Sequence, residues 1–372
     1  MISEYAARHV EFAPGKCYVE YVDQHSSVRT VSGGRILIDR YSRQTLFRGI
    51  GKDGQARLAR STAVIVGCGA LGTVAATILT RAGVGKLRIV DRDFLEYHNL
   101  QRQVIFDEQD ITDQLPKAVA AERHLKKVNS TIEIEGIVAD VNGGNIERLV
   151  SGADVIVDGL DNLETRFLIN DASLKLRIPW VYGGAIASYG MTMTVVPGVT
   201  PCLQCVWHQA TGHGLALTCD TAGVIAPAPF VVASLQAAET LKLLVGAADV
   251  ARDLLYVDVW QGQFTHVKMD RRADCPSCHG EYRFLDARLG TRTTALCGQN
   301  AVQVLNPNVK DLSLSSLAAR LEPLGKVSYN DFMLTFQVDS REMVVFPDGR
   351  AIVKNTTDES LARGLYAKYI GA

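Results

Sequence analysis

Four cysteines of this chain form two Cys-x-x-Cys pairs about seventy residues apart. Thiolates at this spacing are typical ligands of a tetrahedral zinc ion, and four of them leave no coordination position open for chemistry. Redox-active dithiols are the alternative, but two matched pairs suit a closed metal site better. The sequence therefore predicts a structural Zn²⁺ site made of Cys202, Cys205, Cys275 and Cys278.

A glycine-rich turn, Gly67-Cys-Gly-Ala-Leu-Gly72, follows a short apolar segment. Gly67, Gly69 and Gly72 allow a tight strand-to-helix turn whose backbone N–H groups, with Ala70 among them, can bind phosphate. Asp91 ends the next apolar segment, where a carboxylate can bind a ribose hydroxyl. The pattern predicts nucleotide binding and is compatible with NAD, FAD or ATP. A glycine-rich turn without a ligand is the alternative.

Further polar residues of the types that face phosphates lie downstream of this turn. Asn99, Arg102 and Lys117 supply an amide, a forked guanidinium and an ammonium. Asp161 and Asn162 follow another apolar segment, at the place where ligands bind in open α/β sheets, and Asp161 is a natural Mg²⁺ ligand. A nicotinamide site does not need so many cations. Asp161 or Asn162 could instead cap the helix that follows. Any one of the cations could also belong to a solvated surface.

The elements that must position these residues alternate between strand and helix. Strands are predicted at 62–66, 86–91, 132–138 and 154–158, with helices between them. This alternation is typical of a parallel, doubly wound sheet. The predicted fold class is therefore α/β, with a Rossmann-like nucleotide-binding sheet that carries a Cys₄ zinc site. Further along, we expect strands within 180–196, a helix at 229–245 and a hairpin of 254–260 with 263–269.

The sequence divides into three predicted parts: an N-terminal β-hairpin extension at 1–38, a nucleotide-binding domain at 39–280 and a small α+β domain at 281–372. The second part opens with two short helices within 41–60. In the third part a helix is expected at 312–321, followed by strands at 332–338, 342–346 and 351–354. The pattern Thr356-x-x-Glu359 predicts a capping box that opens a last helix.

Composition narrows the class of protein. The chain has 372 residues, is 47% hydrophobic and carries a net charge of −1, so no field suited to nucleic acid or an anionic membrane is expected. The N-terminus has no apolar targeting segment, and no run of about twenty apolar residues occurs. Eight cysteines are too few for a disulfide scaffold of this length. A cytoplasmic enzyme is the expectation.

Taken together, the residues from Arg40 to Gly280 resemble the MoeB/ThiF family of ubiquitin-activating-enzyme-like adenylyltransferases. The resemblance implies ATP- and Mg²⁺-dependent adenylation of the C-terminal Gly-Gly carboxylate of a small ubiquitin-like sulfur-carrier protein, in thiamine or molybdenum cofactor biosynthesis. The motifs that carry it are Arg40-Tyr-Ser-Arg43-Gln, Gly67-x-Gly69-x-x-Gly72, Ala82-Gly-Val-Gly85, Asn99-Leu-Gln-Arg-Gln103, Pro116-Lys117, Asp158-x-x-Asp161-Asn162, the cysteine pairs and Leu217-Thr-Cys219 with Ala222-Gly-Val.

The resemblance also implies roles for single residues. Arg102, Lys117 and an Asp161-bound Mg²⁺ would neutralise the charge that develops when a carboxylate attacks a phosphate. Arg43 would act in the active site of a partner subunit of a homodimer, with Arg48 as the weaker candidate. Ala70 stands where the family often has glycine, and we expect little effect from this change because alanine is nearly as small.

Cys219 matches a position where relatives carry a cysteine that bonds covalently to the carrier or its sulfur. A spectator thiol on a loop is the alternative, and a cysteine desulfurase or a sulfurtransferase would then supply the sulfur as a separate partner. Two other classes of function stay open for the whole chain. One is an NAD-dependent oxidoreductase, and the other is a non-catalytic scaffold that binds a ubiquitin-like protein. The sequence does not name the carrier.

Overall fold

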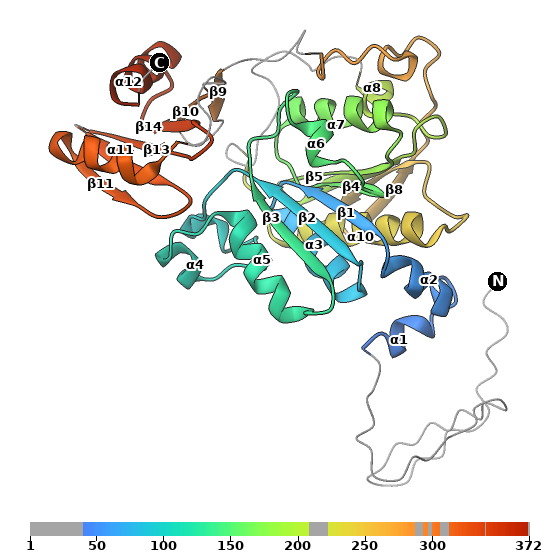
Figure 1. Ribbon diagram of the computed structural model, residues 1–372. Coiled ribbons are helices and arrows are strands. Elements are labelled where there is room, and N and C mark those ends of the chain that lie inside the picture. The colour runs from blue at the N-terminus through green and yellow to red at the C-terminus, as the bar shows by residue number, and fades with distance from the viewer. Residues whose placement is uncertain are drawn as a thin grey trace, which may run out of the picture. The chain divides into compact units, whose positions relative to one another are not determined.

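A computed structural model describes residues 40–207, 222–286, 293–296, 300–305, 312–338 and 340–370 (Figure 1). Tyr41–Ala372 forms one compact unit. The predicted extension at 1–38 and the predicted nucleophile Cys219 lie outside the described residues.

The first sheet has the strand order β3-β2-β1-β4-β5-β6-β7-β8. Its first five strands in this order pair in parallel, whereas β6, β7 and β8 are added antiparallel. The chain leaves β1 toward β2 and β3 and then returns to β4 on the other side, so a topological switch point lies between β1 and β4. The strands are β1 (Thr62–Val66), β2 (Lys86–Asp91), β3 (Glu133–Val138), β4 (Val155–Asp158), β5 (Trp180–Ile186), β6 (Tyr189–Val195), β7 (Leu254–Asp258) and β8 (Gln263–Val267).

Helices cover both faces of this sheet, because β1 is apolar on both sides. Ala63 and Ile65 belong to a core that includes residues of α3, α5 and α10, whereas Val64 and Val66 belong to a second core with residues of α6 and α7. The predicted doubly wound α/β fold is therefore confirmed. The helices are α1 (Ser42–Thr45), α2 (Gly51–Leu58), α3 (Ala70–Ala82), η1 (Tyr97–Asn99), α4 (Glu108–Thr112), α5 (Lys117–Val128), α6 (Ile146–Leu149), α7 (Leu163–Leu176), α8 (Leu203–Val206), α10 (Pro227–Val245) and η2 (Ser277–His279).

Helix α10 is long and apolar enough to cross a membrane by length and composition alone. Half of its most apolar window is nevertheless buried inside the protein, and the helix packs against α3, β5 and β6. Its central Gln236 is fully buried and donates hydrogen bonds to the carbonyl oxygens of Asp158 and Val181, at 2.9 and 3.1 Å. These contacts make α10 a core helix of the first sheet.

The C-terminal residues form a second, antiparallel sheet with the order β11-β12-β13-β14-β10-β9. Residues of β10, β13 and β14 divide between two cores: one core includes residues of β12 and of the helices Leu314–Leu321 and Glu359–Tyr369, and Phe94 packs against the other. The elements are β9 (Thr293–Leu296), β10 (Ala301–Val304), α11 (Leu314–Leu321), η3 (Glu322–Leu324), β11 (Lys326–Tyr329), β12 (Leu334–Val338), β13 (Arg341–Val345), β14 (Ala351–Lys354) and α12 (Glu359–Tyr369).

The predicted capping box at Thr356 is wrong. The N-cap of α12 is Asp358, whose carboxylate accepts the N–H groups of Ser360 and Leu361 at 2.9 and 3.1 Å. Thr356 lies two residues earlier, and its hydroxyl oxygen accepts the N–H of Asp358 at 3.1 Å. An aspartate adjoining the helix binds the free N–H groups directly, so it displaces the threonine from the capping role.

Candidate functional site

The glycine turn between β1 and α3 is tightly packed against the loop after β4. A Cβ atom on Gly72 would lie 2.0 Å from the carbonyl oxygen of Gly67, and one on Gly67 would lie 2.6 Å from the carbonyl of Gly159. Gly67 also has a φ of +93°, which side chains disfavour. The two loops thus meet at the switch point between β1 and β4, where ligands bind in sheets of this kind.

Asp91, at the end of β2, is bonded to the backbone of this region. Its carboxylate accepts the N–H of Cys68 at 2.5 Å and the N–H of Asp93 at 2.7 Å. Burial raises the pKa of the Asp91 carboxyl, and the positive charge of Lys117 opposes the rise. Asp91 therefore joins the glycine turn to the segment that follows β2, at the edge predicted for a ribose.

Lys117, the first residue of α5, is 7% exposed. Its N–H donates to the carbonyl of Asp93 at 2.9 Å, and its ammonium lies 3.3 Å from the Asp93 carboxylate. Burial alone would lower the pKa of Lys117, but the carboxylates of Asp93, Asp91 and Asp161 outweigh it and raise the pKa. Likewise, burial would raise the pKa of Asp93, but Lys117, Arg92 and Arg350 hold it below its ordinary value. The site thus brings one buried cation against three carboxylates.

Asp161 and Asn162 have different surroundings. The Asn162 side chain accepts the N–H of Thr165 at 2.9 Å and caps α7, the alternative that the sequence left open. Asp161 is exposed, and its charge acts on Lys117, Arg92 and Arg166. Its negative charge therefore helps to raise the pKa values of these three cations.

Arg166, a residue outside the predicted site, holds this loop in place. Its guanidinium lies 2.9 Å from the fully buried carboxylate of Asp158 and donates to the carbonyl oxygens of Leu160 and Gly183, at 2.6 and 2.7 Å. Burial raises the pKa of Asp158, while Arg166 and the N–H groups of Leu160 and Gly183 stabilise its charged form. The one local sign of this role in the sequence is that Arg166 follows the helix cap Asn162 by four residues, about one helical turn.

The segment from Asn99 to Gln103 borders the glycine turn through the side-chain amide of Gln103. The Asn99 oxygen accepts the N–H of Glu96 at 3.0 Å, so it caps η1. Arg102 is half-buried and donates to the carbonyl of His98 at 2.7 Å. Gln103 is 4% exposed, and its side-chain oxygen has no hydrogen-bond partner among the described residues. Its amide nitrogen lies 4.0 Å from where a Cβ of Gly69 would be, so Gln103 borders the glycine turn. It belongs to the quoted motif but was not predicted as a site residue.

Arg43 lies at the far end of α3 from the glycine turn. The side chains of Gln44 and Gln55 both donate to the carbonyl of Ala82, at 2.8 and 3.0 Å, and this fixes α1 and α2 at the C-terminal end of α3. The 13 residues of α3 separate that end from the turn by about 20 Å. Arg43 and Arg48 are both exposed there. Within one chain, neither arginine is brought together with Lys117 or Asp161.

The four cysteines of the two pairs form one cluster, in which three are buried and Cys278 is half-buried. Neighbouring Sγ atoms lie 3.5 to 3.7 Å apart, and all four are free thiols. Four sulfur atoms at Zn–S distances of about 2.3 Å in a tetrahedron are about 3.8 Å apart, so the cluster fits a tetrahedral ion. The predicted meeting of the two pairs is confirmed, and a single cluster in which sulfur atoms of each pair lie against the other fits one metal site better than two separate redox dithiols.

A buried carboxylate supports this cluster from α7. Asp171, 1% exposed, accepts the hydroxyl of Ser277, which lies between Cys275 and Cys278, at 2.7 Å. Its other oxygen accepts the N–H groups of Phe284 and Leu285, at 2.9 and 3.4 Å. One side chain thus ties the second cysteine pair and the residues just beyond it to the first sheet.

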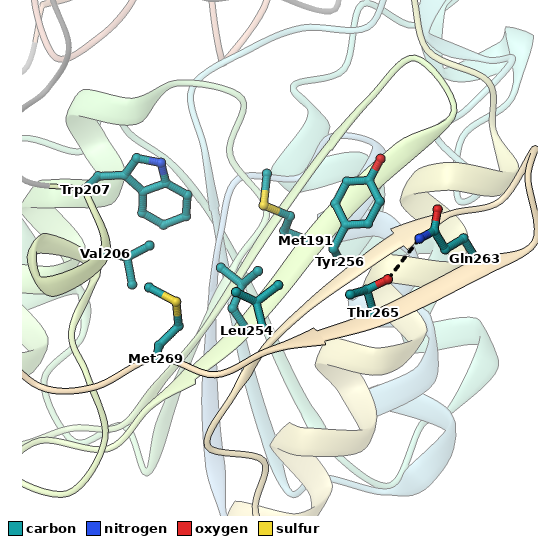
Figure 2. Close-up of a pocket in the computed structure, with 9 residues that line it drawn as sticks. Met191, Val206, Trp207, Leu254, Tyr256, Gln263, Thr265 and Met269 are labelled. Carbon is teal, nitrogen blue, oxygen red and sulfur yellow. Dashed lines mark hydrogen bonds between the residues drawn. The ribbon is translucent and has the colours of Figure 1, made fainter.

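An apolar groove of about 490 Å³ runs along β6, β7 and β8 (Figure 2). The strand register places the Tyr189, Asp258 and Gln263 ends of these strands beside the carboxyl end of β5, at the edge where the glycine turn lies. Trp207 at the other end borders residues 208–221, which contain Cys219 and are not described. The lining residues are Met191, Val206, Trp207, Leu254, Tyr256, Gln263, Thr265, Val267 and Met269.

Comparison with known proteins shows which family this chain belongs to. Residues 41–277 match the model of the ThiF family. The chain is 44% identical over 339 residues to the sulfur carrier protein ThiS adenylyltransferase of Bacillus subtilis (strain 168), which covers 90% of this chain and 100% of that protein. That alignment leaves out only about a tenth of the chain, so it extends past residue 277 into the C-terminal region.

Two further similarities each cover about two thirds of the chain. The SAMP-activating enzyme E1 of Haloferax volcanii is 37% identical over 250 residues, which are 67% of this chain and 92% of that protein. The crystal structure of E. coli MccB with ATP has a TM-score of 0.57 at 25% identity, over 65% of this chain and 75% of that one.

Proposed function

This chain belongs to the ThiF family, and on that premise we propose that it adenylates the C-terminal Gly-Gly carboxylate of a small ubiquitin-like sulfur-carrier protein at the expense of ATP. The chain is thus an adenylyltransferase of the kind that serves thiamine or molybdenum cofactor biosynthesis. The observation that carries the proposal is the buried Lys117 beside the glycine turn. It contacts the Asp93 carboxylate, and the charges of Asp91 and Asp161 help to raise its pKa.

The reaction joins two anions, so the protein must supply positive charge and N–H donors. A carboxylate oxygen of the carrier bonds to the α-phosphorus of ATP, the bond from that phosphorus to the β-phosphate oxygen breaks, and pyrophosphate leaves. Lys117 and Arg102 offset the negative charge that develops. The N–H groups at the start of α3 orient the phosphates. A Mg²⁺ ion held by Asp161 would supply further positive charge at the phosphates.

ATP–pyrophosphate exchange tests this proposal. We expect exchange of labelled pyrophosphate into ATP only when Mg²⁺ and a carrier ending in Gly-Gly are both present. A carrier that lacks its last two glycines is the matched control and should support none. Exchange that is independent of the carrier would contradict the proposal, and tight binding of NAD(H) without exchange would favour the oxidoreductase alternative. Carrier binding without any exchange would favour the scaffold alternative.

We also propose that the cysteine cluster holds zinc in a structural role. The purified protein is expected to contain about one zinc per chain, because four thiolates saturate a tetrahedral ion. Cys275→Ser should lower both the zinc content and the thermal midpoint, since metal binding and folding are coupled. Metal analysis and thermal denaturation measure both effects. Cys68→Ser, a buried thiol outside the cluster, is the control for zinc content. Freshly purified protein with no zinc and a Cys–Cys disulfide would reverse the assignment.

The groove along β6 to β8 is our proposed docking site for the folded body of the carrier. Its walls are mostly apolar, and the exposed Trp260 lies in the turn that joins β7 to β8. Exposed apolar patches of this kind mark protein interaction surfaces. A carrier seated there would have its C-terminus directed along the strands toward Gln263 and the nucleotide edge, because that is where these strands end.

The remaining assignments stay proposals of the same kind. Cys219 is proposed as a thiol that takes over the activated acyl group, with a spectator role as the alternative and a desulfurase or sulfurtransferase as sulfur donor. We propose a homodimer, supported by the exposed Leu46 and Phe47 next to Arg43, at 71% and 66% exposure. The domain boundaries at 38/39 and 280/281 and a cytoplasmic location are proposed from the sequence.

A further inference from the structure

One face of the C-terminal sheet packs on the segment that follows β2. The core on that face contains Phe346, Val344 and Ile352, and Phe94 packs against it. The rings of Phe94 and Phe346 lie 5.6 Å apart between centroids. Phe94 directly follows Asp93, the carboxylate that pairs with Lys117. The C-terminal sheet therefore contacts the chain at the residue next to the proposed nucleotide site.

Arg350 is the charged residue at this contact. It follows a turn between β13 and β14, and its side chain is 0% exposed. It donates to the carbonyl of Arg92 at 3.2 Å, and its guanidinium carbon lies 3.8 Å from the centroid of the Phe346 ring. Its Nε and Nη1 atoms have no hydrogen-bond partner among the described residues. Its Nε is 3.7 Å from Asp348, too long for a hydrogen bond.

A buried guanidinium with two unbonded nitrogens is costly unless neighbouring charges compensate it. Burial lowers the pKa of Arg350, and Asp348, Asp140 and Asp93 oppose that change. Asp140 is itself held from both sides: the guanidinium of Arg92 lies at 2.7 Å, and the Gln303 amide of the C-terminal sheet donates at 2.9 Å. Asp348 and the carboxylates after β2 and β3 are thus the charges that offset the cost of burying Arg350.

These contacts form a continuous connection from the C-terminal sheet to the nucleotide site. Gln303 bonds Asp140, Asp140 pairs with Arg92, and the carbonyl of Arg92 accepts from Arg350. Arg92 is covalently joined to both Asp91 and Asp93. The peptide that presents these two carboxylates to Lys117 and the glycine turn is therefore held on its far side by two residues of the C-terminal sheet.

We propose that Arg350 is a positioning residue for adenylation, which sets the backbone at Arg92 and thereby the carboxylates of Asp91 and Asp93 for binding ATP. The inference rests on the proposed function, and it gives the C-terminal sheet a part in the nucleotide site.

Direct titration of the full-length protein with ATP, followed by calorimetry, tests the inference apart from any carrier. R350M should weaken the affinity for ATP by about tenfold, the effect of losing one hydrogen bond from a charged group. In exchange assays the KM for ATP should rise by the same factor, with kcat changed much less. R350K, which keeps the charge without the planar fork, should recover part of the affinity. Q303L should weaken it to a smaller extent.

The matched control is R320M. Arg320 lies in the same sheet domain and donates to the carbonyl oxygens of Tyr369 and Ile370, at 2.9 and 2.8 Å, without contact to the segment 91–94 in the described residues. R320M should lower the thermal midpoint and leave the affinity for ATP unchanged. Equal affinity in wild type and R350M, or an equal loss in R320M, would overturn the role of Arg350. If R350M does not fold, R350K and Q303L decide the question by the same readout.

The outcomes also separate this inference from the proposed function. ATP binding by the wild type without carrier-dependent exchange would contradict the proposed adenylation. The ATP affinities of the wild type and R350M would still test the role of Arg350. Normal exchange with an unchanged KM in R350M and R350K would sink the role of Arg350 alone. A wild-type protein that does not bind ATP at all would overturn both.

Discussion

Asp161→Ala is expected to lower carrier-dependent ATP–pyrophosphate exchange by roughly a hundredfold to a thousandfold, the range found when one group that stabilises transition-state charge is removed. Asp161 is the exposed carboxylate of its loop, and its charge acts on Lys117, Arg92 and Arg166. It takes no part in capping α7, since Asn162 does so. The variant should therefore fold normally and fail in catalysis, which thermal denaturation and initial exchange rates distinguish.

Asp107→Ala is the matched control for this variant. Asp107 is likewise an exposed aspartate in a loop, and its carboxylate caps α4. Its loss should cost about 1 kcal/mol of stability, the usual value of an N-cap, and leave exchange intact. Raising the Mg²⁺ concentration should restore part of the exchange of Asp161→Asn if the carboxylate binds the ion. Exchange by Asp161→Ala near the wild-type level would remove Asp161 from the mechanism.

A mixture of Arg43→Ala and Asp161→Ala chains is expected to regain about a quarter of wild-type exchange, although each variant alone is inactive. Random subunit exchange makes half of the dimers mixed, and each mixed dimer has one complete site. The expectation follows from the placement of α1 at the end of α3, about 20 Å from the glycine turn of the same chain. Arg43 can then serve only a neighbouring subunit's site.

Subunit exchange must be verified in that experiment, for example with two different affinity tags. Arg57→Ala, which removes an arginine from α2 near the same end of α3, should remain active by itself. Inactivity of the mixture after verified exchange would mean that Arg43 acts within its own chain or not at all. A size measurement that gives only monomers under active conditions would contradict the shared site as well.

The first sheet was predictable because its signals are local. The strand 62–66 is an apolar run that ends at Gly67, and the strand 86–91 follows Gly85 and buries Leu87, Ile89 and Val90. The glycines at 67 and 72 were predictable too, since a side chain at either position would collide with backbone. The meeting of the two cysteine pairs was predictable because a tetrahedral zinc ion needs four thiolates.

Other features depend on contacts that no local pattern reveals. That Asp93, and not Asp91 alone, pairs with Lys117 depends on backbone pairing between 93–94 and 116–117. Arg350 is 258 residues from the carbonyl that it binds. The strands Lys326–Tyr329 and Ala301–Val304 are each only four residues long, and the first is mostly exposed while the second is buried throughout, so neither gives a longer run of alternating buried and exposed residues. Both were missed in the sequence analysis.

The buried carboxylate of Asp171 has a consequence for where this chain can be shortened. A chain that ended at Gly280 would keep both cysteine pairs, but it would lose the two N–H donors at Phe284 and Leu285 that satisfy one oxygen of Asp171. It would also lose Phe284, whose ring stacks on Phe167 at 4.9 Å. An unsatisfied buried oxygen costs about 1 to 3 kcal/mol. The first sheet therefore needs the chain as far as Leu285, five residues beyond the boundary predicted at Gly280.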